Sequence, residues 1–226
     1  EVDINALPEL EQYVLHRLYC LNNNFKKCFR NYDFHNLYKE LLNFCTVDLS
    51  AFYFDIRKDT LYCDPKDSKK RKFSLIILNI ILNSLLKWFA PILSFTTEEI
   101  YQLVSKKNKS IHLEKFLDYP KKFENLELND KWIELLKIRD VCNLSIEQKR
   151  AEKIIGSSLE ASLKINLDKK NLNLVKSVDL AELCITSSVE VVESNNDQIF
   201  VETTKANGEK CPVCWKINPN KCPRHD

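Results

Sequence analysis

The sequence predicts a mainly α-helical protein that continues into a small α+β unit and ends in a short cysteine-rich module. Apolar residues recur three and four positions apart through most of residues 7–155, as in amphipathic helices. From about residue 159, apolar and polar residues alternate as in strands. The final residues, 210–226, hold three cysteines and a histidine in two close pairs. We therefore expect a helical domain over residues 1–126, a junction over 127–206 and a terminal module over 207–226.

Composition favours a globular protein in a reducing environment. The chain has 226 residues, of which 44% are hydrophobic and 29% charged, and its net charge of +2 does not by itself predict a nucleic-acid partner. The only two glycines, Gly156 and Gly208, exclude a glycine-rich phosphate loop. Six of the nine cysteines lack the spacing of metal ligands, which is typical of buried thiols in a cytosolic protein: Cys20, Cys28, Cys45, Cys63, Cys142 and Cys184.

The first half of the chain predicts four helices. The first begins near Pro8 and runs to about Arg30, and the second, capped by Asp33, covers residues 34–49. The third begins at Asp67 or Ser68 and continues through residue 90. Its apolar run, residues 73–86, is broken by polar residues and is too short for a membrane span, so we expect the centre of a helical bundle.

A capping box predicts the start of the fourth helix. Thr96 would be the N-cap and Glu99, three residues later, would close the box, with the helix ending near Val104. Glu98 and Glu99 are therefore interpreted as helix-start residues rather than as a catalytic pair of carboxylates. We expect residues 105–128 to form a connecting loop.

The second half predicts one long helix followed by strands. The helix covers residues 130–155 and ends at Gly156 as its C-cap. Alternation over residues 159–167 indicates a strand, and residues 180–193 and 198–204 are two further runs rich in β-branched residues. The stretch 170–177 between them could form a helix.

The end of the chain predicts a metal site. Cys211 and Cys214 form a C-x-x-C pair, and Cys222 and His225 form a C-x-x-H pair. Four such ligands suit a closed tetrahedral zinc site with no open position for water. Free cysteines in a frayed tail, or a redox C-x-x-C, are the alternatives, but the redox motif belongs beside a βαβ pattern that is absent here. We expect one structural zinc ion per chain.

Two basic stretches, residues 66–72 and 205–226, are candidate phosphate-binding surfaces, although either could be an ordinary solvated surface. The stretch over residues 48–64 is rich in both aromatic and charged side chains. It could be a helix corner with a buried aromatic side, which is the simpler interpretation, or a surface that meets RNA.

Five segments give the chain a resemblance to the bacterial isoleucyl-tRNA synthetases. They are residues 7–18 (LPELEQYVLHRL), 48–62 (DLSAFYFDIRKDTLY), 88–101 (WFAPILSFTTEEIY), 153–161 (KIIGSSLEA) and the cysteine pairs of 211–225. The resemblance covers essentially the whole chain, and the second and fourth segments are its most specific parts. One departure concerns the metal site, because the family usually ends in two C-x-x-C pairs and this chain has His225 at the fourth position.

The resemblance implies a helical anticodon-binding domain, a junction domain and a zinc module that together hold the anticodon end of a tRNA. The parent enzyme would join isoleucine to its tRNA with ATP. The catalytic signatures H-I-G-H and K-M-S-K-S do not occur in this sequence, so we expect no catalytic residues here and ATP only in a separate catalytic domain. A chain that begins at Glu1 and contains no methionine also favours a C-terminal piece of a longer protein.

The leading hypothesis is a cytoplasmic tRNA-binding region, with isoleucine tRNA and the catalytic and editing domains of its own parent as partners, and no membrane or DNA partner. Trp215 could stack on an anticodon base or pack the zinc module against the junction, and the other expected tRNA contacts are phosphate-binding cations: Arg57, Lys58, Arg71, Lys72, Lys216 and Arg224. The alternative is a free-standing zinc-containing protein-interaction module without tRNA affinity. A self-contained enzyme is the third and weakest hypothesis.

Overall fold

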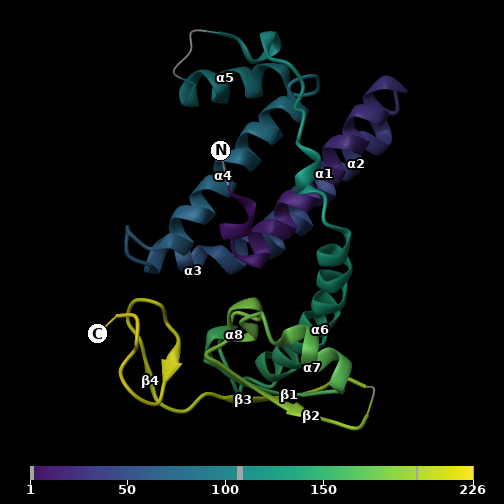
Figure 1. Cartoon of the computed structure of the whole chain (residues 1–226). Coiled ribbons are helices and arrows are strands. Elements are labelled where there is room, and N and C mark those ends of the chain that lie inside the picture. The colour runs from purple at the N-terminus through teal and green to yellow at the C-terminus, as the bar shows by residue number, and fades with distance from the viewer. Residues whose placement is uncertain (1–2, 106–108, 197, 226) are drawn as a thin grey trace. The chain divides into compact units, whose positions relative to one another are not determined.

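The computed structural model describes residues 3–105, 109–196 and 198–225, and Figure 1 shows a chain built mainly of helices with a small sheet. This confirms the predicted fold class. The chain divides into two compact units. Unit 1 comprises Glu1–Asp55 and Pro65–Asn125, and unit 2 comprises Ile56–Asp64 and Leu126–Asp226. The short segment Ile56–Asp64 thus belongs to a different unit from the residues on either side of it.

Unit 1 is helical. Its long elements are α1 (Glu9–Arg30), α2 (Phe34–Asn43), the π-helix η2 (Phe44–Phe54), α4 (Lys69–Phe89) and α5 (Ser94–Val104). Three short 3₁₀ turns complete it: η1 (Ile4–Ala6), η3 (Ile111–Leu113) and η4 (Lys121–Phe123). The predicted starts of α1 and α4 are confirmed, since Pro8 precedes α1 and the hydroxyl of Ser68 caps α4 by accepting the Arg71 N–H at 3.3 Å.

A buried tryptophan ties α1 to α4 in the core of unit 1. The indole N–H of Trp88 donates to Asn22 Oδ1 at 3.0 Å, and the Asn22 amide donates to the Leu117 carbonyl at 3.1 Å. Both residues are almost fully buried, so these bonds satisfy polar groups that would otherwise be costly to bury. The same three helices, α1, α2 and α4, also bury apolar side chains in the core of unit 1: Leu15, Leu18, Leu41, Ile77 and Ile81.

The prediction of a single helix over residues 34–49 was wrong. The α-helix ends at Asn43 and continues as the π-helix η2. The Thr46 hydroxyl donates to the Leu42 carbonyl at 2.9 Å, and such side-chain bonds compete with the regular backbone ladder. Buried Phe44 and Leu49 lie five positions apart, a spacing that suits the wider π turn.

The predicted capping box was also wrong. Helix α5 begins at Ser94, with Leu93 as its N-cap, so Thr96 lies inside the helix. The hydroxyl of Thr97 donates to the Leu93 carbonyl at 2.9 Å. Glu98 accepts the Ile111 N–H at 2.9 Å and thereby ties the loop back to the helix. The hydrogen bond from Gln102, followed by that from Ile111, lowers the pKa of Glu98.

Helix α4 is long and apolar enough to cross a membrane by length and composition alone, with a mean hydropathy of 1.4 over its most apolar window. The apolar run considered in the sequence was shorter than the helix that contains it. Core helices of water-soluble bundles meet the same criterion; in this helix 33% of that window is buried, and α4 contacts both α1 and α5 in unit 1.

Unit 2 combines helices with two small sheets. Its helices are α3 (Asp55–Cys63), α6 (Leu126–Ala151), α7 (Lys169–Val175) and α8 (Leu180–Leu183), with a 3₁₀ turn η5 (Ser158–Glu160). Strands β1 (Ala161–Leu167), β2 (Ser188–Glu193) and β3 (Phe200–Lys205) form a sheet in the order β2-β1-β3. β1 pairs parallel with β2 and antiparallel with β3, and α7 and α8 make the crossover between the parallel strands.

Helix α6 packs on this sheet through a polar contact as well as its apolar face. The Ser145 hydroxyl lies 2.7 Å from that of Thr203 and 3.2 Å from the Val201 carbonyl. The core residues of the sheet and helix are apolar and buried, namely Leu135, Ile138, Leu163 and Ile165. The positions of β1, β3 and α7 confirm the predicted strands over residues 159–167 and 198–204 and the helix over 170–177.

Several boundaries in unit 2 differ from the prediction, and the first is that helix α6 begins at Leu126 rather than at residue 130. The expected strand 180–193 begins as helix α8, because Asp179 caps it by accepting the Glu182 N–H at 3.1 Å. Helix α6 ends at Ala151, and Lys153, with a φ of 59°, takes the left-handed conformation expected of Gly156. The Gly156 N–H instead donates to the Glu160 carboxylate at 3.0 Å, which lowers the pKa of Glu160.

Candidate metal centre and nucleic-acid interface

A two-stranded hairpin positions the metal-ligand residues at the end of the chain. β4 (Glu209–Lys210) pairs antiparallel with β5 (Ile217–Asn218), and Cys211 and Cys214 lie in the turn between them (Figure 1). Gly208, with a φ of 126°, allows the approach to β5, because a Cβ there would lie 2.0 Å from the Asn218 carbonyl oxygen.

The four predicted ligands come together in one cluster. The ligand atoms of Cys211, Cys214, Cys222 and His225 all lie within 4.8 Å of one another. The Sγ atoms of Cys214 and Cys222 are 3.8 Å apart, and His225 Nδ1 lies 3.5 Å from Cys211 Sγ and 3.4 Å from Cys222 Sγ. A tetrahedral zinc site has edges of about 3.8 Å between sulfurs and about 3.6 Å between sulfur and nitrogen. Three of the six edges of the cluster therefore match those of a tetrahedral zinc site, and the other three are no longer than 4.8 Å.

The thiols of the C-x-x-C pair are held in different electrostatic surroundings. Backbone N–H groups of Cys214 and Val213, with a contribution from His225, lower the pKa of Cys211 to about 6, although burial opposes this. Burial, together with the neighbouring thiols, raises the pKa of Cys214 to about 11. A cation held among these sulfurs would favour the thiolate form of every ligand.

Helix α3 supplies the outer partner of the histidine ligand. Nε2 of His225 lies 3.0 Å from the Cys63 carbonyl oxygen at the C-terminal end of α3. A carbonyl can only accept, so Nε2 carries the hydrogen and Nδ1 presents its lone pair to the cluster. Burial alone would lower the pKa of His225, but the bond to Cys63 and those to Cys211 and Cys222 raise it.

The same end of α3 binds the neighbouring arginine. Arg224 forms ion pairs with Asp59, at 2.6 Å, and with Asp64. Burial works against the charged form, but the hydrogen bonds to both carboxylates raise the pKa of Arg224. The Cys63 thiol also contacts the Val213 carbonyl at 3.6 Å. Within unit 2, the terminal module is thus bonded to α3.

The junction sheet provides a second attachment. The Ile217 N–H of β5 donates to the Ser187 hydroxyl at 2.7 Å, and that hydroxyl donates to the Leu159 carbonyl. Lys210 of β4 forms an ion pair with Glu160 at 3.7 Å. The hairpin is therefore held by the G-S-S-L-E-A segment as well as by α3.

Among the expected phosphate-binding residues, Arg57 and Arg224 do not fit that role. Arg57 is only 2% exposed, and its guanidinium pairs with Glu182 of α8 at 2.8 Å. Arg224 forms ion pairs with two carboxylates, Asp59 of α3 and Asp64 directly after it. Both arginines hold unit 2 together, which sequence reasoning missed because their partners lie more than a hundred positions away in the chain.

The remaining expected contacts lie at the surface of their own units. In unit 2, Lys58 is exposed, Lys216 is half-buried and Trp215 is 60% exposed. Trp215 has a φ of 64°, an unusual backbone conformation for a bulky residue, and the Lys210 ammonium lies 5.8 Å from its ring centroid. In unit 1, Arg71 and Lys72 lie in the first turn of α4.

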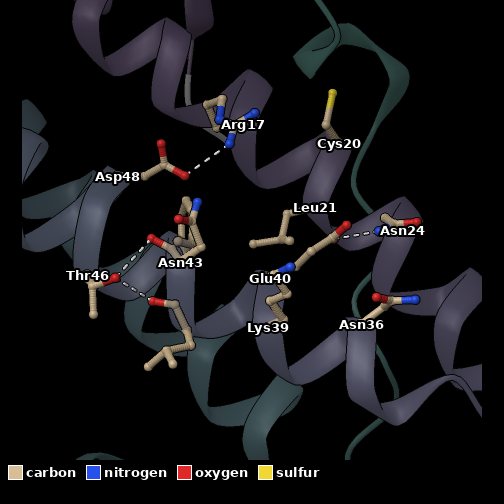
Figure 2. Close-up of a pocket in the computed structure, with 12 residues that line it drawn as sticks. Arg17, Cys20, Leu21, Asn24, Asn36, Lys39, Glu40, Asn43, Thr46 and Asp48 are labelled. Atoms are coloured by element: carbon tan, nitrogen blue, oxygen red, sulfur yellow. Dashed lines mark hydrogen bonds and ion pairs between the residues drawn. The ribbon is translucent and has the colours of Figure 1, made fainter.

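Unit 1 also contains a groove that the sequence reasoning did not single out. It has a volume of about 730 Å³ and lies between α1, α2 and η2. Figure 2 shows side chains from both helices around it, with Arg17 bonded to Asp48 and Asn24 bonded to Glu40. The sequence signal that could have indicated this groove is a set of polar residues at helical spacing on two consecutive helices.

Comparison with known proteins gives related sequences along almost the entire chain. An isoleucine–tRNA ligase from Pelagibacter ubique is 68% identical over 99% of this chain. Isoleucine–tRNA ligases from Bartonella henselae and Agrobacterium fabrum are 38% and 40% identical, each over 96% of the chain. The chain spans 25%, 23% and 24% of the lengths of these three relatives, or about a quarter.

The model of one protein family matches most of unit 1 and continues through α6 into β1. Its description is the anticodon-binding domain of tRNA ligase, and the match covers residues 11–165, well over half of the chain. This goes against the alternative of a protein-interaction module without tRNA affinity. The chain therefore belongs to the family of anticodon-binding domains of tRNA ligases.

Proposed function

We propose that this chain is the tRNA-binding region of an isoleucine–tRNA ligase and that it contributes binding and orientation rather than catalysis. The observation that carries the proposal is the 68% identity to an isoleucine–tRNA ligase over 99% of the chain, together with the family match. In this proposal, the parent enzyme attaches isoleucine to its tRNA with ATP in the cytoplasm. Its catalytic and editing domains are then partners of this region within the same polypeptide.

The proposal includes one structural zinc ion held by Cys211, Cys214, Cys222 and His225. The tetrahedral spacing of their ligand atoms and the outer bond from His225 to the Cys63 carbonyl support it. Zinc would supply folding free energy to a hairpin that buries few apolar side chains of its own, on the order of 10 kcal/mol for small zinc modules. With four protein ligands, no position would remain for a catalytic water.

The proposed RNA contacts are the expected residues that are exposed or half-buried. Lys58, Lys216, Arg71 and Lys72 would neutralise phosphates, which positions the tRNA without reading its sequence. Trp215, exposed beside the metal cluster, would stack on an unpaired base. We retain the division into a helical domain (1–126), a junction (127–206) and a zinc module (207–226), with α3 serving the last two.

The test is equilibrium binding of the zinc-loaded 226-residue chain to isoleucine tRNA and to a non-cognate tRNA at two salt concentrations. We expect tighter binding to the isoleucine tRNA, with affinity for both falling as salt rises, because phosphate neutralisation releases counterions. Binding without preference would remove the isoleucine-specific part of the proposal. An absence of binding to either tRNA at low salt would overturn it altogether.

A further inference from the structure

We propose that the groove between α1 and α2 receives one unstacked base of the bound RNA and reads its edge through side-chain amides. This rests on the proposed tRNA-binding function and goes further, because it assigns a base-binding site to residues of unit 1. The groove is formed by α1, α2 and the start of η2.

The pattern of side chains is unusual for two adjacent helices of a hairpin. Arg17, Leu21 and Asn24 lie four and three positions apart on α1, so they share one face. On α2, Asn36, Lys39 and Asn43 share a face in the same way. Facing stripes of packed helices are normally apolar. Here most of the residues that line the groove are polar, and α2 buries the apolar side chains Leu37 and Leu41 instead.

The charges of the groove favour a neutral polar ligand over a phosphate. Arg17 and Lys39 are balanced by Glu40 and Asp48, and all four residues line the groove. The Arg17 guanidinium is bound to Asp48 at 3.0 Å, and the Asn24 amide donates to Glu40 (Figure 2). The volume of about 730 Å³ lies within the range of small-molecule sites, about 300–1,000 Å³. A nucleobase is a flat, neutral ligand of suitable size.

Asn43 is the best candidate for direct readout. Across residues 3–105, 109–196 and 198–225, its side-chain amide has no hydrogen-bond partner, whereas the amide of Asn36 donates to Asp33 at 2.8 Å. An amide offers a donor and an acceptor side by side, which is the pattern that adenine and other base edges complement. The Asn43 carbonyl already accepts from Thr46, so the backbone at the start of η2 is held in place.

Exposed aromatic residues on the same hairpin could hold the flanking bases. Tyr32, in the turn between α1 and α2, is 80% exposed, and Tyr38 on α2 is 50% exposed. Bases of single-stranded RNA stack on such rings with little sequence preference. The hairpin therefore combines stacking surfaces with one polar groove, as expected where RNA loops are read base by base.

The experiment combines a groove variant with single abasic substitutions in the anticodon loop of isoleucine tRNA. Asn43→Ala should weaken binding about tenfold, the loss expected for one base contact. Asn23→Ala is the matched control, because Asn23 is an exposed asparagine of α1 that does not line the groove, and it should change affinity less than about twofold. Asn43→Asp keeps the shape of the side chain but replaces its amide donor with a charged carboxylate, so it should weaken binding at least as much as Asn43→Ala with an unchanged melting temperature.

The outcomes separate this proposal from the proposed function. The groove is supported as the site of a base if, at one loop position, the losses of binding free energy caused by the abasic substitution and by Asn43→Ala are not additive. Full additivity at every position, with normal binding by the unaltered chain, would overturn the groove and leave the tRNA-binding function intact. The groove proposal would also be overturned if Asn43→Ala lowered the melting temperature of the protein and reduced affinity equally for every abasic tRNA. No binding by the unaltered chain would overturn the function, and the groove proposal with it.

Discussion

The Nε2 atom of His225 lies 3.0 Å from the carbonyl oxygen of Cys63, so the last described residue of the chain is bonded to the end of a helix 162 positions earlier. Because the acceptor belongs to the backbone, no side-chain substitution at residue 63 removes it. The bond selects the tautomer that presents Nδ1 to the three thiols. It also gives a reason for histidine at the fourth ligand position.

The first prediction concerns metal content. The unaltered chain should carry one zinc ion, Cys222→Ser should lose it, and His225→Cys should retain it because a four-cysteine site is equally acceptable to zinc. Metal analysis and competition with a chromophoric chelator measure both content and affinity. Cys45→Ser, which alters a thiol outside the cluster, is the control and should keep its zinc. Unaltered protein that holds no zinc when prepared aerobically without a tag would contradict the prediction.

The second prediction separates a structural arginine from a phosphate-binding lysine. Arg224→Gln removes the ion pairs with Asp59 and Asp64 and should destabilise unit 2 by about 1 kcal/mol, the upper value for partly exposed pairs. The salt dependence of tRNA binding should be the same in the Arg224→Gln variant as in the unaltered chain. Lys216→Gln should do the opposite, with a shallower salt slope and little change in stability. Denaturant unfolding and tRNA titrations at several salt concentrations test both, and the reverse pattern would contradict the assignment.

The third prediction concerns the buried pair of Arg57 and Glu182. Glu182→Ala should destabilise unit 2 by about 3–5 kcal/mol, because it breaks an ion pair whose guanidinium is buried. Glu134→Ala, which removes an exposed pair with Lys137 on α6, should cost less than about 0.5 kcal/mol. Urea unfolding of both variants gives the comparison. Similar losses in the two would show that the Arg57 charge is not buried in solution.

The fourth prediction compares the two glycines. Gly208→Ala places a Cβ against the Asn218 carbonyl at a φ of 126°, so the β4–β5 hairpin must distort and zinc affinity should fall at least tenfold. At Gly156 the nearest atom to an added Cβ is 3.6 Å away, so Gly156→Ala should retain normal affinity. Chelator competition measures both. Equal affinities in the two variants would mean that the metal site forms independently of the hairpin.

The fifth prediction concerns Trp215. Trp215→Ala should weaken tRNA binding about tenfold or more, since stacking of one base on an aromatic ring contributes about 1–3 kcal/mol. Zinc content and melting temperature should stay unchanged, because most of the indole is exposed and little packing is lost. Trp215→Phe should restore much of the affinity. Loss of zinc in the alanine variant would assign the ring to packing, and unchanged affinity would exclude stacking.

Local sequence patterns were sufficient where the structure is determined locally. The spacing of Cys211, Cys214, Cys222 and His225 predicted a cluster that the fold does bring together. The starts of α1 and α4 followed from Pro8 and Ser68, whose effects reach only the next turn. The predicted boundaries were wrong where a nearby side chain bonds to the backbone, as Thr46 does within η2 and Asp179 does at the start of α8.

The distant relationships were beyond such patterns. Arg57 lies in a stretch of mixed charges and aromatics, and nothing in its neighbourhood indicates that it pairs with Glu182, 125 positions later. The sequence of α2 does not predict the groove either. Its polar face, with Asn36, Lys39 and Asn43, is indistinguishable in sequence from a solvated surface, and only the fold shows that it lines a groove with residues of α1. Helical period shows that residues share a face but not what that face meets.

The assignment of Ile56–Asp64 to unit 2 has a consequence for how the protein is made. The chain passes between the units three times, at residues 55–56, 64–65 and 125–126, so no single cut releases either unit whole. During synthesis, α3 leaves the ribosome long before α8 and the terminal hairpin that bind it. Unit 1 therefore folds from two segments of the chain that flank α3, and α3 gains its partners in unit 2 only after those later residues have been translated.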